Sequence, residues 1–306
     1  MRKDSRPLQG RTVVVTGAAR GVGAALARAF DDRGARLALL GLEGAGLHEV
    51  AGSLRNESAC WEVDVTDDAA MADTARKVRA HLGPASVVVG NAGVAEGGPF
   101  ADSDPQVWRR VIEVNLIGSA ATARCFLPDL LDTHGYYLQV ASLASMGTSP
   151  LMSAYCASKA GVESFAHALR AELAHRGVAI GVAYINWTDT DMIRDADRHA
   201  VLRELRAHMP PPARKVYPAA QVADRLATAA ERRSTSVYMP AWLRAVQPVR
   251  AGLPAVVTHI ARAELPRLER TQSFEATGLL GAGGRADERR DTARRPERGS
   301  AEEPDG

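Results

Sequence analysis

The sequence predicts one α/β domain built on a doubly wound parallel sheet of about seven strands, with helices on both faces. Short β-branched runs alternate along the chain with longer Ala- and Leu-rich amphipathic stretches. The connections between strands are long enough for right-handed crossovers. Apolar residues are nearly continuous in most of the strand candidates, which indicates burial on both faces of the sheet. We therefore expect one catalytic domain over residues 8–240.

The expected elements follow in a regular order. The strand candidates are short and apolar: Thr12–Thr16, Arg36–Leu40, Ala59–Val63, Ser86–Gly90, Tyr136–Ala141, Val178–Ile185 and Ser236–Met239. The helix candidates are longer and amphipathic: Val22–Arg33, Gly46–Leu54, Ala69–Leu82, Gln106–Leu131, Ser153–His175, Met192–His208 and Ala219–Arg232. Asp67, and Asp104 before Pro105, stand where helix N-cap residues are expected.

Composition excludes several classes of protein. A hydrophobic content of 46% and a formal net charge of +2 describe a soluble globular chain and not a nucleic-acid binder with a strongly basic face. The three cysteines are widely spaced and form no CxxC pair, so we expect free thiols, no metal site and a cytoplasmic location. Residues 1–10 lack the apolar core of a secretory signal, and no apolar stretch is long enough to cross a membrane.

The C-terminal part differs in composition from the rest. Trp242–Arg270 mixes apolar side chains with arginine and proline, and three interpretations of residues 241–277 are open: packing on the domain, an oligomer contact, or contact with a membrane surface. From Gly278 the sequence turns to Gly, Arg, Asp, Glu and Pro with little to bury, so residues 278–306 are expected to form a disordered tail.

A glycine-rich turn follows the first strand candidate. Gly17, Gly21 and Gly23 stand between this strand and an Ala-rich helix, where backbone N–H groups and a helix N-terminus can receive a pyrophosphate. The spacing GxxxGxG departs from the common GxGxxG pattern, and a tight turn that needs positive φ is the alternative interpretation. The position of the turn favours a Rossmann-type dinucleotide-binding domain.

A tyrosine and a lysine carry the strongest chemical signal. Tyr155 and Lys159 lie four residues apart on one predicted helix and therefore share a face. Lysine is scarce in this arginine-rich chain, and Ser142 ends a strand thirteen residues before Tyr155. A nearby ammonium favours the phenolate of a tyrosine, so Lys159 is expected to tune Tyr155 as an acid and base. Taken singly, Tyr155 would be a core tyrosine and Lys159 a surface lysine.

Together with Asn91-Ala92-Gly93 after the fourth strand and Asn115 in the long fourth helix, these motifs resemble the short-chain dehydrogenase/reductase family. The resemblance covers roughly Gly10 to Pro240. It implies that Tyr155 exchanges the alcohol proton and that Ser142 hydrogen-bonds the substrate oxygen. It also implies that Lys159 holds the nicotinamide ribose and that Asn115 anchors a water relay to Lys159.

The same resemblance implies the remaining cofactor contacts. Asp64 would meet the adenine ring and Thr190 the carboxamide, although Ile185-Asn186 stands where the family has Pro-Gly. The residues expected at NAD(P) are Gly17, Ala19, Arg20, Gly21, Val22, Gly23, Gly41, Asp64, Val65, Asn91, Ala92, Gly93, Tyr155, Lys159, Thr188 and Thr190.

The choice between NAD and NADP is read at the end of the second strand. An acidic residue there bonds the ribose hydroxyls of NAD, and an arginine accommodates the extra phosphate of NADP. The diagnostic positions are Gly41 and Leu42, which provide neither group. Arg20 could reach a 2′-phosphate, whereas Glu43 could reach the ribose or repel the phosphate. Arg20 tips the expectation toward NADP.

The substrate is expected to be a hydrophobic alcohol or ketone, such as a steroid-like, acyl or terpenoid compound. Residues 192–209 would form a lid over an apolar pocket beside Tyr155, lined by Ser142, Leu143, Ala144, Met146, Met152, Trp187 and Met192. The family resemblance implies a homodimer or homotetramer formed through the fourth and fifth long helices. A catalytically silent sensor or scaffold that binds dinucleotide, and a membrane-surface enzyme anchored by Trp242–Arg270, are the alternatives.

Overall fold

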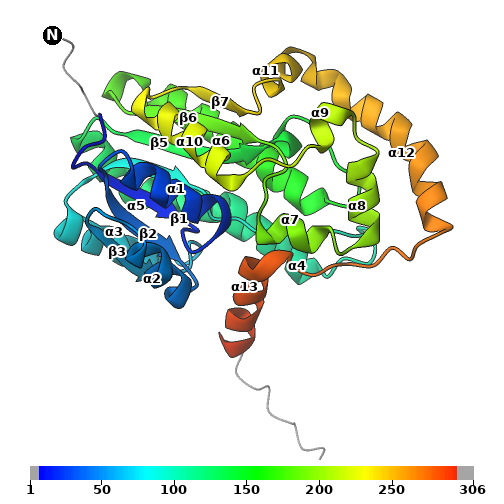
Figure 1. Cartoon of the computed structure of the whole chain (residues 1–306), viewed down its shortest axis with the longest axis horizontal. Coiled ribbons are helices and arrows are strands. Elements are labelled where there is room, and N and C mark those ends of the chain that lie inside the picture. Colours follow the sequence, from blue (N-terminus) through cyan, green and yellow to red (C-terminus); the bar gives the residue numbers. More distant parts are fainter. Residues whose placement is uncertain (1–6, 295–306) are drawn as a thin grey trace, which may run out of the picture.

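The computed structural model describes residues 7–294 and forms a seven-stranded parallel sheet with helices on both faces (Figure 1). The strand order is β3-β2-β1-β4-β5-β6-β7. The strands are β1 (Thr12–Thr16), β2 (Arg36–Gly41), β3 (Ser58–Glu62), β4 (Ala85–Gly90), β5 (Tyr136–Ser142), β6 (Ala179–Ile185) and β7 (Ser236–Met239). The predicted fold class is thus confirmed. The order reverses between β1 and β4, and ligands bind at such a switch point in doubly wound sheets.

The helices close over the sheet between successive strands. They are α1 (Gly21–Asp31), α2 (Gly44–Gly52), α3 (Asp68–Leu82), α4 (Pro105–Ile112), α5 (Gly118–Asp132), α6 (Ser153–Leu173), α7 (Asp191–Ala196), α8 (Ala200–Ala207), α9 (Pro211–Arg214), α10 (Ala219–Glu231), α11 (Leu243–Val246), α12 (Leu253–Glu269) and α13 (Gly281–Arg294). The predicted caps are confirmed, because Asp67 accepts from Ala70 N and Asp104 from Gln106 N.

The sheet separates two apolar cores. Alternate side chains of each strand point to opposite faces, so Val14 packs with α3, α5 and α6, whereas Val13 and Val15 pack with α1 and α10. Both faces are therefore dry, which explains the continuous apolar runs of the central strands. This two-sided burial makes the sheet a rigid support for the side chains at its carboxyl edge.

The predicted helix 106–131 is interrupted. A π-helical turn, η1 (Glu113–Ile117), separates α4 from α5. At its centre Asn115 turns inward, where its side chain both accepts from Val94 N and donates to Val94 O. A π turn inserts one extra residue into a helix and is frequent at functional sites. Apolar periodicity does not reveal it, because the residues on both sides remain helical.

The predicted lid helix 192–208 is also broken. Residues 197–199 form a turn between α7 and α8. Asp197 accepts a hydrogen bond from Arg206, and its backbone oxygen accepts one from Arg203, so α8 folds back on the turn. The lid is therefore two short helices that pack separately.

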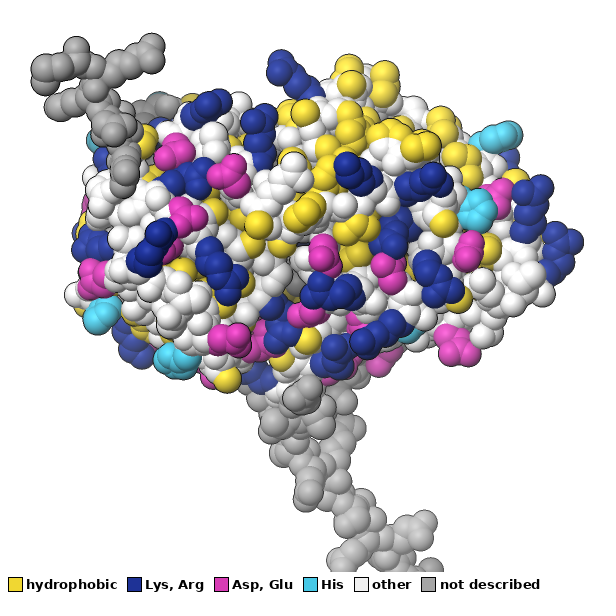
Figure 2. All heavy atoms as spheres, in the orientation of Figure 1, with side chains coloured by type: hydrophobic (Ala, Val, Ile, Leu, Met, Phe, Trp, Pro, Cys, Tyr) yellow, Lys and Arg dark blue, Asp and Glu magenta, His cyan; other side chains and the backbone are white. Residues whose placement is uncertain are grey.

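Residues 241–277 pack against the domain through few anchors. Leu243 lies in the main core, and Arg250 pairs with Glu163 of α6 and donates to Ser145 O. Most of α12 is exposed, and Figure 2 shows hydrophobic side chains gathered over this region, to which Val249, Val256 and Ile260 contribute. Within the described residues, no helix is long and apolar enough to span a membrane.

The expectation of disorder from Gly278 needs correction over residues 281–294, which form α13. This helix lies against α7 (Figure 1). Its sequence has almost no amphipathic pattern, and its place is fixed instead by buried Leu279, Leu280 and Asp287. Residues 295–306 of the predicted tail lie outside the described part.

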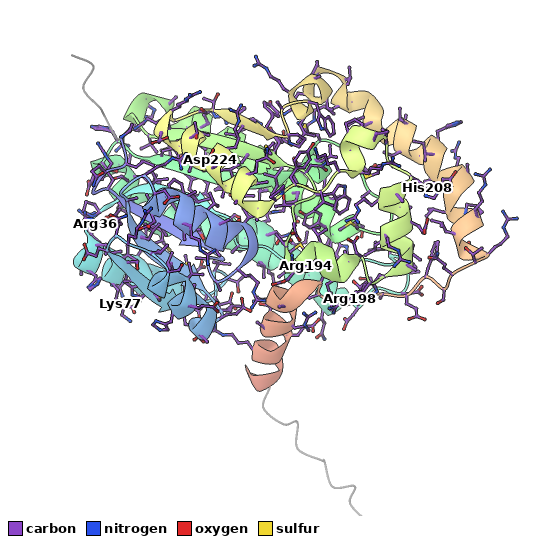
Figure 3. The ribbon with its side chains drawn as sticks, in the orientation of Figure 1. Arg36, Lys77, Arg194, Arg198, His208 and Asp224 are labelled. Carbon is purple, nitrogen blue, oxygen red and sulfur yellow. The ribbon has the colours of Figure 1, made fainter. Side chains whose placement is uncertain are left out.

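Charged side chains otherwise cover the outer surface. Lys77 and Asp224 point away from the domain (Figure 3) and pair with Asp73 and Arg33. Cys60, Cys125 and Cys156 are free thiols, as the sequence predicts. Among the described residues, no cluster of His, Cys, Asp or Glu has the arrangement of a metal site.

Candidate active site

The glycine-rich turn forms a close passage between β1 and α1. Gly17 and Gly21 adopt positive φ values of 64° and 52°, which favour glycine. A Cβ on Gly23 would lie 2.0 Å from the Gly17 oxygen, so only glycine fits there. The α1 N-cap residue, Arg20, makes no side-chain capping hydrogen bond. The first N–H groups of α1 are thus left to a ligand, as in anion-binding helix termini.

The Asn91-Ala92-Gly93 segment is fastened to this turn. Asn91 Nδ2 donates to Thr16 O at 2.9 Å, and Thr16 Oγ1 accepts from the backbone N of Asn91 and Ala92 at 3.0 Å. A Cβ on Gly93 would lie 3.0 Å from Asn115 Oδ1 and 3.6 Å from Lys159 Nζ. The segment therefore brings the glycine turn, the π turn and α6 together.

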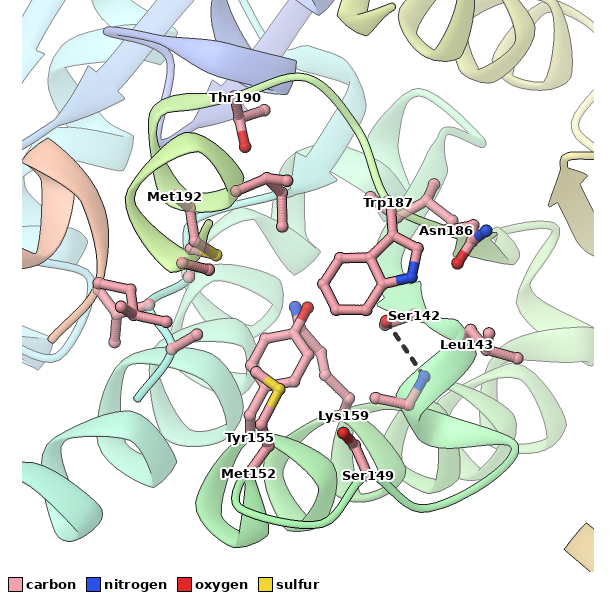
Figure 4. Close-up of a pocket in the computed structure, with 18 of the residues that line it drawn as sticks. Ser142, Leu143, Ser149, Met152, Tyr155, Lys159, Asn186, Trp187, Thr190 and Met192 are labelled. Atoms are coloured by element: carbon pink, nitrogen blue, oxygen red, sulfur yellow. Dashed lines mark hydrogen bonds between the residues drawn. The ribbon is translucent and has the colours of Figure 1, made fainter. Parts of the chain in front are cut away.

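Tyr155, from α6, and Ser142, the last residue of β5, both face the same cavity (Figure 4). Burial raises the pKa of Tyr155 to about 12, although a hydrogen bond with Ser142 acts in the opposite direction. Ser142 Oγ also accepts from Ala144 N at 3.2 Å, which fixes its rotamer. Both residues line the cavity.

Lys159 lies beneath Tyr155, with Nζ 5.7 Å from the centre of the tyrosine ring. Its side chain is buried, and Nζ donates to Val140 O at 3.3 Å. Burial lowers the pKa of Lys159 to about 8. The sequence predicts that this ammonium favours the phenolate of Tyr155. Burial outweighs the hydrogen bond with Ser142 and raises the pKa of Tyr155, so the effect of Lys159 on this phenol stays a prediction.

Asn115 lies one layer deeper. Besides its two bonds to Val94, it donates to Ser158 Oγ at 2.9 Å, and Ser158 neighbours Lys159 on α6. Asn115 does not line the cavity, so its contact with Lys159 is through neighbouring groups. The sequence places Asn115 in a helix. The π turn explains why its side chain points inward, toward Val94 and Ser158.

Arg20 is already paired. Its guanidinium donates from Nε and Nη2 to the two carboxylate oxygens of Glu43, and Nη1 lies 3.3 Å from Asp191 Oδ2. The sequence treats Arg20 and Glu43 as opposed signals, whereas the structure joins them in one ion pair. Gly41 ends β2 without a side chain that could reach a ribose.

Asp64 is buried at the end of β3. Burial raises its pKa, but hydrogen bonds from Thr66 and the positive charge of Arg110 outweigh this and hold the pKa below the usual range. Arg110 Nη2 donates to Asp64 Oδ2 at 2.8 Å. This arginine was not singled out by the sequence, because its contact depends on the approach of α4 to β3.

The segment after β6 departs from the family pattern and is well fixed. Asn186 N donates to Met239 O at 3.0 Å and its Nδ2 to Ala213 O at 2.9 Å, so the asparagine ties β6 to β7 and α9. Thr188 Oγ1 turns back to Asn186 O and lies outside the cavity lining. Thr190 remains at the cavity beside Gly21.

The glycine turn, the Asn91-Ala92-Gly93 segment, Asp64, Ser142, Tyr155, Lys159 and Thr190 border one cavity of about 630 Å³. Of the predicted cofactor residues, only Ala19 and Thr188 do not line it. The predicted substrate residues Leu143, Ala144, Met152, Trp187 and Met192 all do (Figure 4), but Met146 is buried in the core. The sequence missed further apolar lining residues from the lid and the C-terminal part: Leu202, Leu205, Met209, Trp242, Leu253, Val256, Val257 and Ile260.

Comparison with known proteins agrees with this geometry. The sequence model of the short chain dehydrogenases matches residues 11–200. The chain belongs to this family. It is 31% identical over 220 residues to a short chain dehydrogenase of Pseudocercospora fijiensis, covering 68% of this chain and 71% of the relative. It is 34% identical to the cis-4-hydroxycyclohexanecarboxylate dehydrogenase of Sinomonas cyclohexanicum, covering 60% and 75%.

A solved structure also shares the fold of this short chain dehydrogenase. It is a short chain dehydrogenase/reductase from Burkholderia phymatum in complex with NAD, 26% identical, with a TM-score of 0.70. The match covers 79% of this chain and 93% of that one. The seven-stranded sheet and its strand order are thus those of the family.

Proposed function

We propose that the protein is an NAD(P)-dependent oxidoreductase that interconverts a secondary alcohol and a ketone on a hydrophobic substrate. The observation that carries the proposal is the gathering of Tyr155, Ser142 and the buried Lys159, with Nζ 5.7 Å from the tyrosine ring, at one largely apolar cavity. A bound nicotinamide dinucleotide would supply hydride transfer. The protein supplies position, proton exchange and exclusion of water.

Tyr155 is the proposed general acid and base. With a pKa of about 12 its phenol keeps its proton at neutral pH, so it is ready to donate to a ketone oxygen during reduction. Ser142 would donate a second hydrogen bond to the same oxygen and so stabilise the negative charge that develops there. The buried amine of Lys159 would hold ribose hydroxyls and connect through the π-turn region to Asn115.

The residues that would hold the dinucleotide fit it in shape and polarity. The N-terminus of α1 and the φ values of Gly17 and Gly21 suit a pyrophosphate, and Asp64 suits a group that donates hydrogen bonds. Thr190 lies where a carboxamide would meet α7.

The sequence favours NADP because of Arg20. The contacts of Arg20 in the structure favour NAD instead. A 2′-phosphate would have to displace Glu43 from a two-point ion pair and then lie beside a carboxylate. The NAD in the related Burkholderia structure supports the same choice. Glu43→Gln should shift the ratio of NADPH to NADH affinities toward NADPH by about tenfold, the scale of one charge-assisted contact. An unchanged ratio would contradict this assignment.

The substrate is proposed to be an apolar or alicyclic secondary alcohol. The relative that acts on cis-4-hydroxycyclohexanecarboxylate supports a ring substrate, and the apolar lining residues of α7, α8 and α12 support an apolar one. The test is a screen of cyclic, steroid-like, terpenoid and long-chain secondary alcohols and ketones, followed by nicotinamide absorbance. Turnover confined to small charged sugars would contradict the proposal. Cofactor binding without turnover of any member would favour a silent sensor.

A homodimer or homotetramer in the cytoplasm is proposed as the working form. Exposed Ile117 lies on the π turn between α4 and α5, beside the long helices that would make the contact. The three free thiols agree with a reducing compartment. Light scattering of the purified chain tests the assembly, and a monomer at all concentrations would contradict it.

A further inference from the structure

The segment before α13 is joined to the edge of the cofactor cleft by backbone bonds. Thr277 N donates to Gly97 O and Leu280 N to Ala95 O, both at 2.8 Å, and Leu279 forms an antiparallel bridge with Glu96. Residues 95–97 follow directly on the Asn91–Val94 segment of the site. Leu279 and Leu280 are buried there, so the segment is built into the wall of the cleft.

A second group of contacts joins α13 to the lid. Gly281 N and Arg285 Nη1 both donate to Asp195 Oδ2 at 2.8 Å. A Cβ on Gly281 would lie 2.8 Å from Met192 Cα, so the two backbones are in close contact. Because α7 carries Thr190 and Met192 at its start, α13 holds the part of the lid that faces the nicotinamide end of the cavity.

A third contact reaches the opposite end of the site. Asp287 is 2% exposed and accepts from Arg110 Nε at 2.7 Å. The same guanidinium donates to Asp64 Oδ2 at 2.8 Å and to Thr66 Oγ1 at 2.9 Å. One arginine thus connects the C-terminal helix to the aspartate expected at the adenine. Removal of Asp287 would leave the Arg110 guanidinium paired with Asp64 but would cut the connection between α13 and the end of the cavity at Asp64.

These three contacts surround the cavity on its outer side. Leu280, Gly281, Gly283, Gly284 and Asp287 line the same cavity as the glycine turn and Tyr155. We infer that residues 277–294 are a strap that completes the dinucleotide site and retains the bound cofactor. The inference rests on the proposed NAD(P) dependence, and it concerns residues beyond the 11–200 that the family model matches.

The strap predicts the kinetic behaviour of the enzyme. The dinucleotide lies between the sheet edge and the strap, so its release requires the contacts at Asp195 or Asp287 to open. Opening steps of this kind limit turnover in many enzymes. Loosening the strap should therefore speed release and raise the KM for the dinucleotide.

The test uses the full chain with Asp287→Ala, and a chain ending at Ala276 as a second variant. Asp73→Ala is the control, because Asp73 forms an exposed ion pair on α3. The measurement is the NADH dissociation rate by stopped-flow fluorescence, after circular dichroism shows that each variant is folded. We expect a rise of about tenfold or more in both strap variants and none in the control.

The possible failures are distinguishable. If the full chain binds NADH and both strap variants release it within about twofold of the full-chain rate, residues 277–294 do not retain the cofactor and the proposed function stands. If the folded full chain binds no nicotinamide dinucleotide, both are wrong. As an independent readout, NADH should slow tryptic cleavage after exposed Arg285 in the full chain, and equal cleavage with and without NADH would contradict the strap.

Discussion

At the residue scale, burial shifts the pKa values of Tyr155 and Lys159 in the directions that favour their uncharged forms. Burial raises the pKa of the phenol to about 12 and lowers that of the amine to about 8. Both groups therefore favour the neutral form more than they would in water. Such perturbed groups in one cavity are typical of a functional site.

Tyr155→Phe should keep the fold and dinucleotide binding but lower kcat by about 10²–10⁴-fold, because only the proton donor is removed. The measurement is steady-state turnover of any substrate found in the screen. Tyr217→Phe is the matched control, since Tyr217 lies outside the cavity lining and should keep full activity. Equal activity of the Tyr155 variant would end the proposed mechanism.

Lys159 gives a pH dependence of stability. Below about pH 8 the amine is protonated in both the folded and the unfolded chain, so the folded chain bears the full cost of burying the charge. Between about pH 8 and the ordinary lysine pKa of 10.5 only the unfolded chain keeps the proton, and stability rises with pH. The shift corresponds to about 3 kcal/mol.

Lys159→Met should therefore stabilise the protein at pH 7 while removing activity. We expect a gain of about 1–3 kcal/mol in the free energy of unfolding at pH 7, which shrinks toward pH 10. Lys77→Met, at an exposed site, should show no such trend. Urea unfolding at pH 7 and pH 10 measures the free energy of unfolding of both variants. A loss of stability in the Lys159 variant at pH 7 would contradict the cost assigned to burying the charged amine.

At the element scale, the junction of β1 and α1 tolerates no side chain. Gly23→Ala places a Cβ against the Gly17 oxygen, so the turn must open and the N–H groups of α1 lose their arrangement. We expect the dinucleotide affinity to fall by about 100-fold or more, the scale of several lost backbone contacts. The control is Gly52→Ala, where a Cβ would meet no atom within 4 Å. Similar calorimetric affinities for the two variants would argue against this use of the turn.

The sequence predicts a helix or strand well where a single repeat of apolar residues runs along the whole element. The strands and α1, α3, α6 and α10 follow from apolar patterns and caps. The π turn at Asn115, the break at residues 197–199 and α13 were not predictable in this way, because tertiary hydrogen bonds of Asn115, Asp197 and Asp287 decide them. Motif spacing predicts that Ser142, Tyr155 and Lys159 lie together, and the structure places all three at one cavity, whereas the partners Arg110 and Asp287 depend on contacts distant in sequence.

At the scale of the whole molecule, one cavity runs from Tyr155 to the exposed helix α12. Val257 lines it, whereas Val249 of the same C-terminal part is exposed and does not. Val257→Asp should raise the KM for apolar substrates by about tenfold, because a carboxylate loses hydration when an apolar group binds beside it. Val249→Asp should leave the KM unchanged. Equal effects of the two would indicate that α12 is not part of the substrate site.

The central claim is that this cavity binds a nicotinamide dinucleotide for hydride transfer. The most direct test is a calorimetric titration of the purified full chain with NAD, NADH, NADP and NADPH separately. We expect saturable binding at one site per chain, with NAD and NADH, which lack the 2′-phosphate, preferred over NADP and NADPH. Binding of none of the four by protein shown to be folded would contradict the claim.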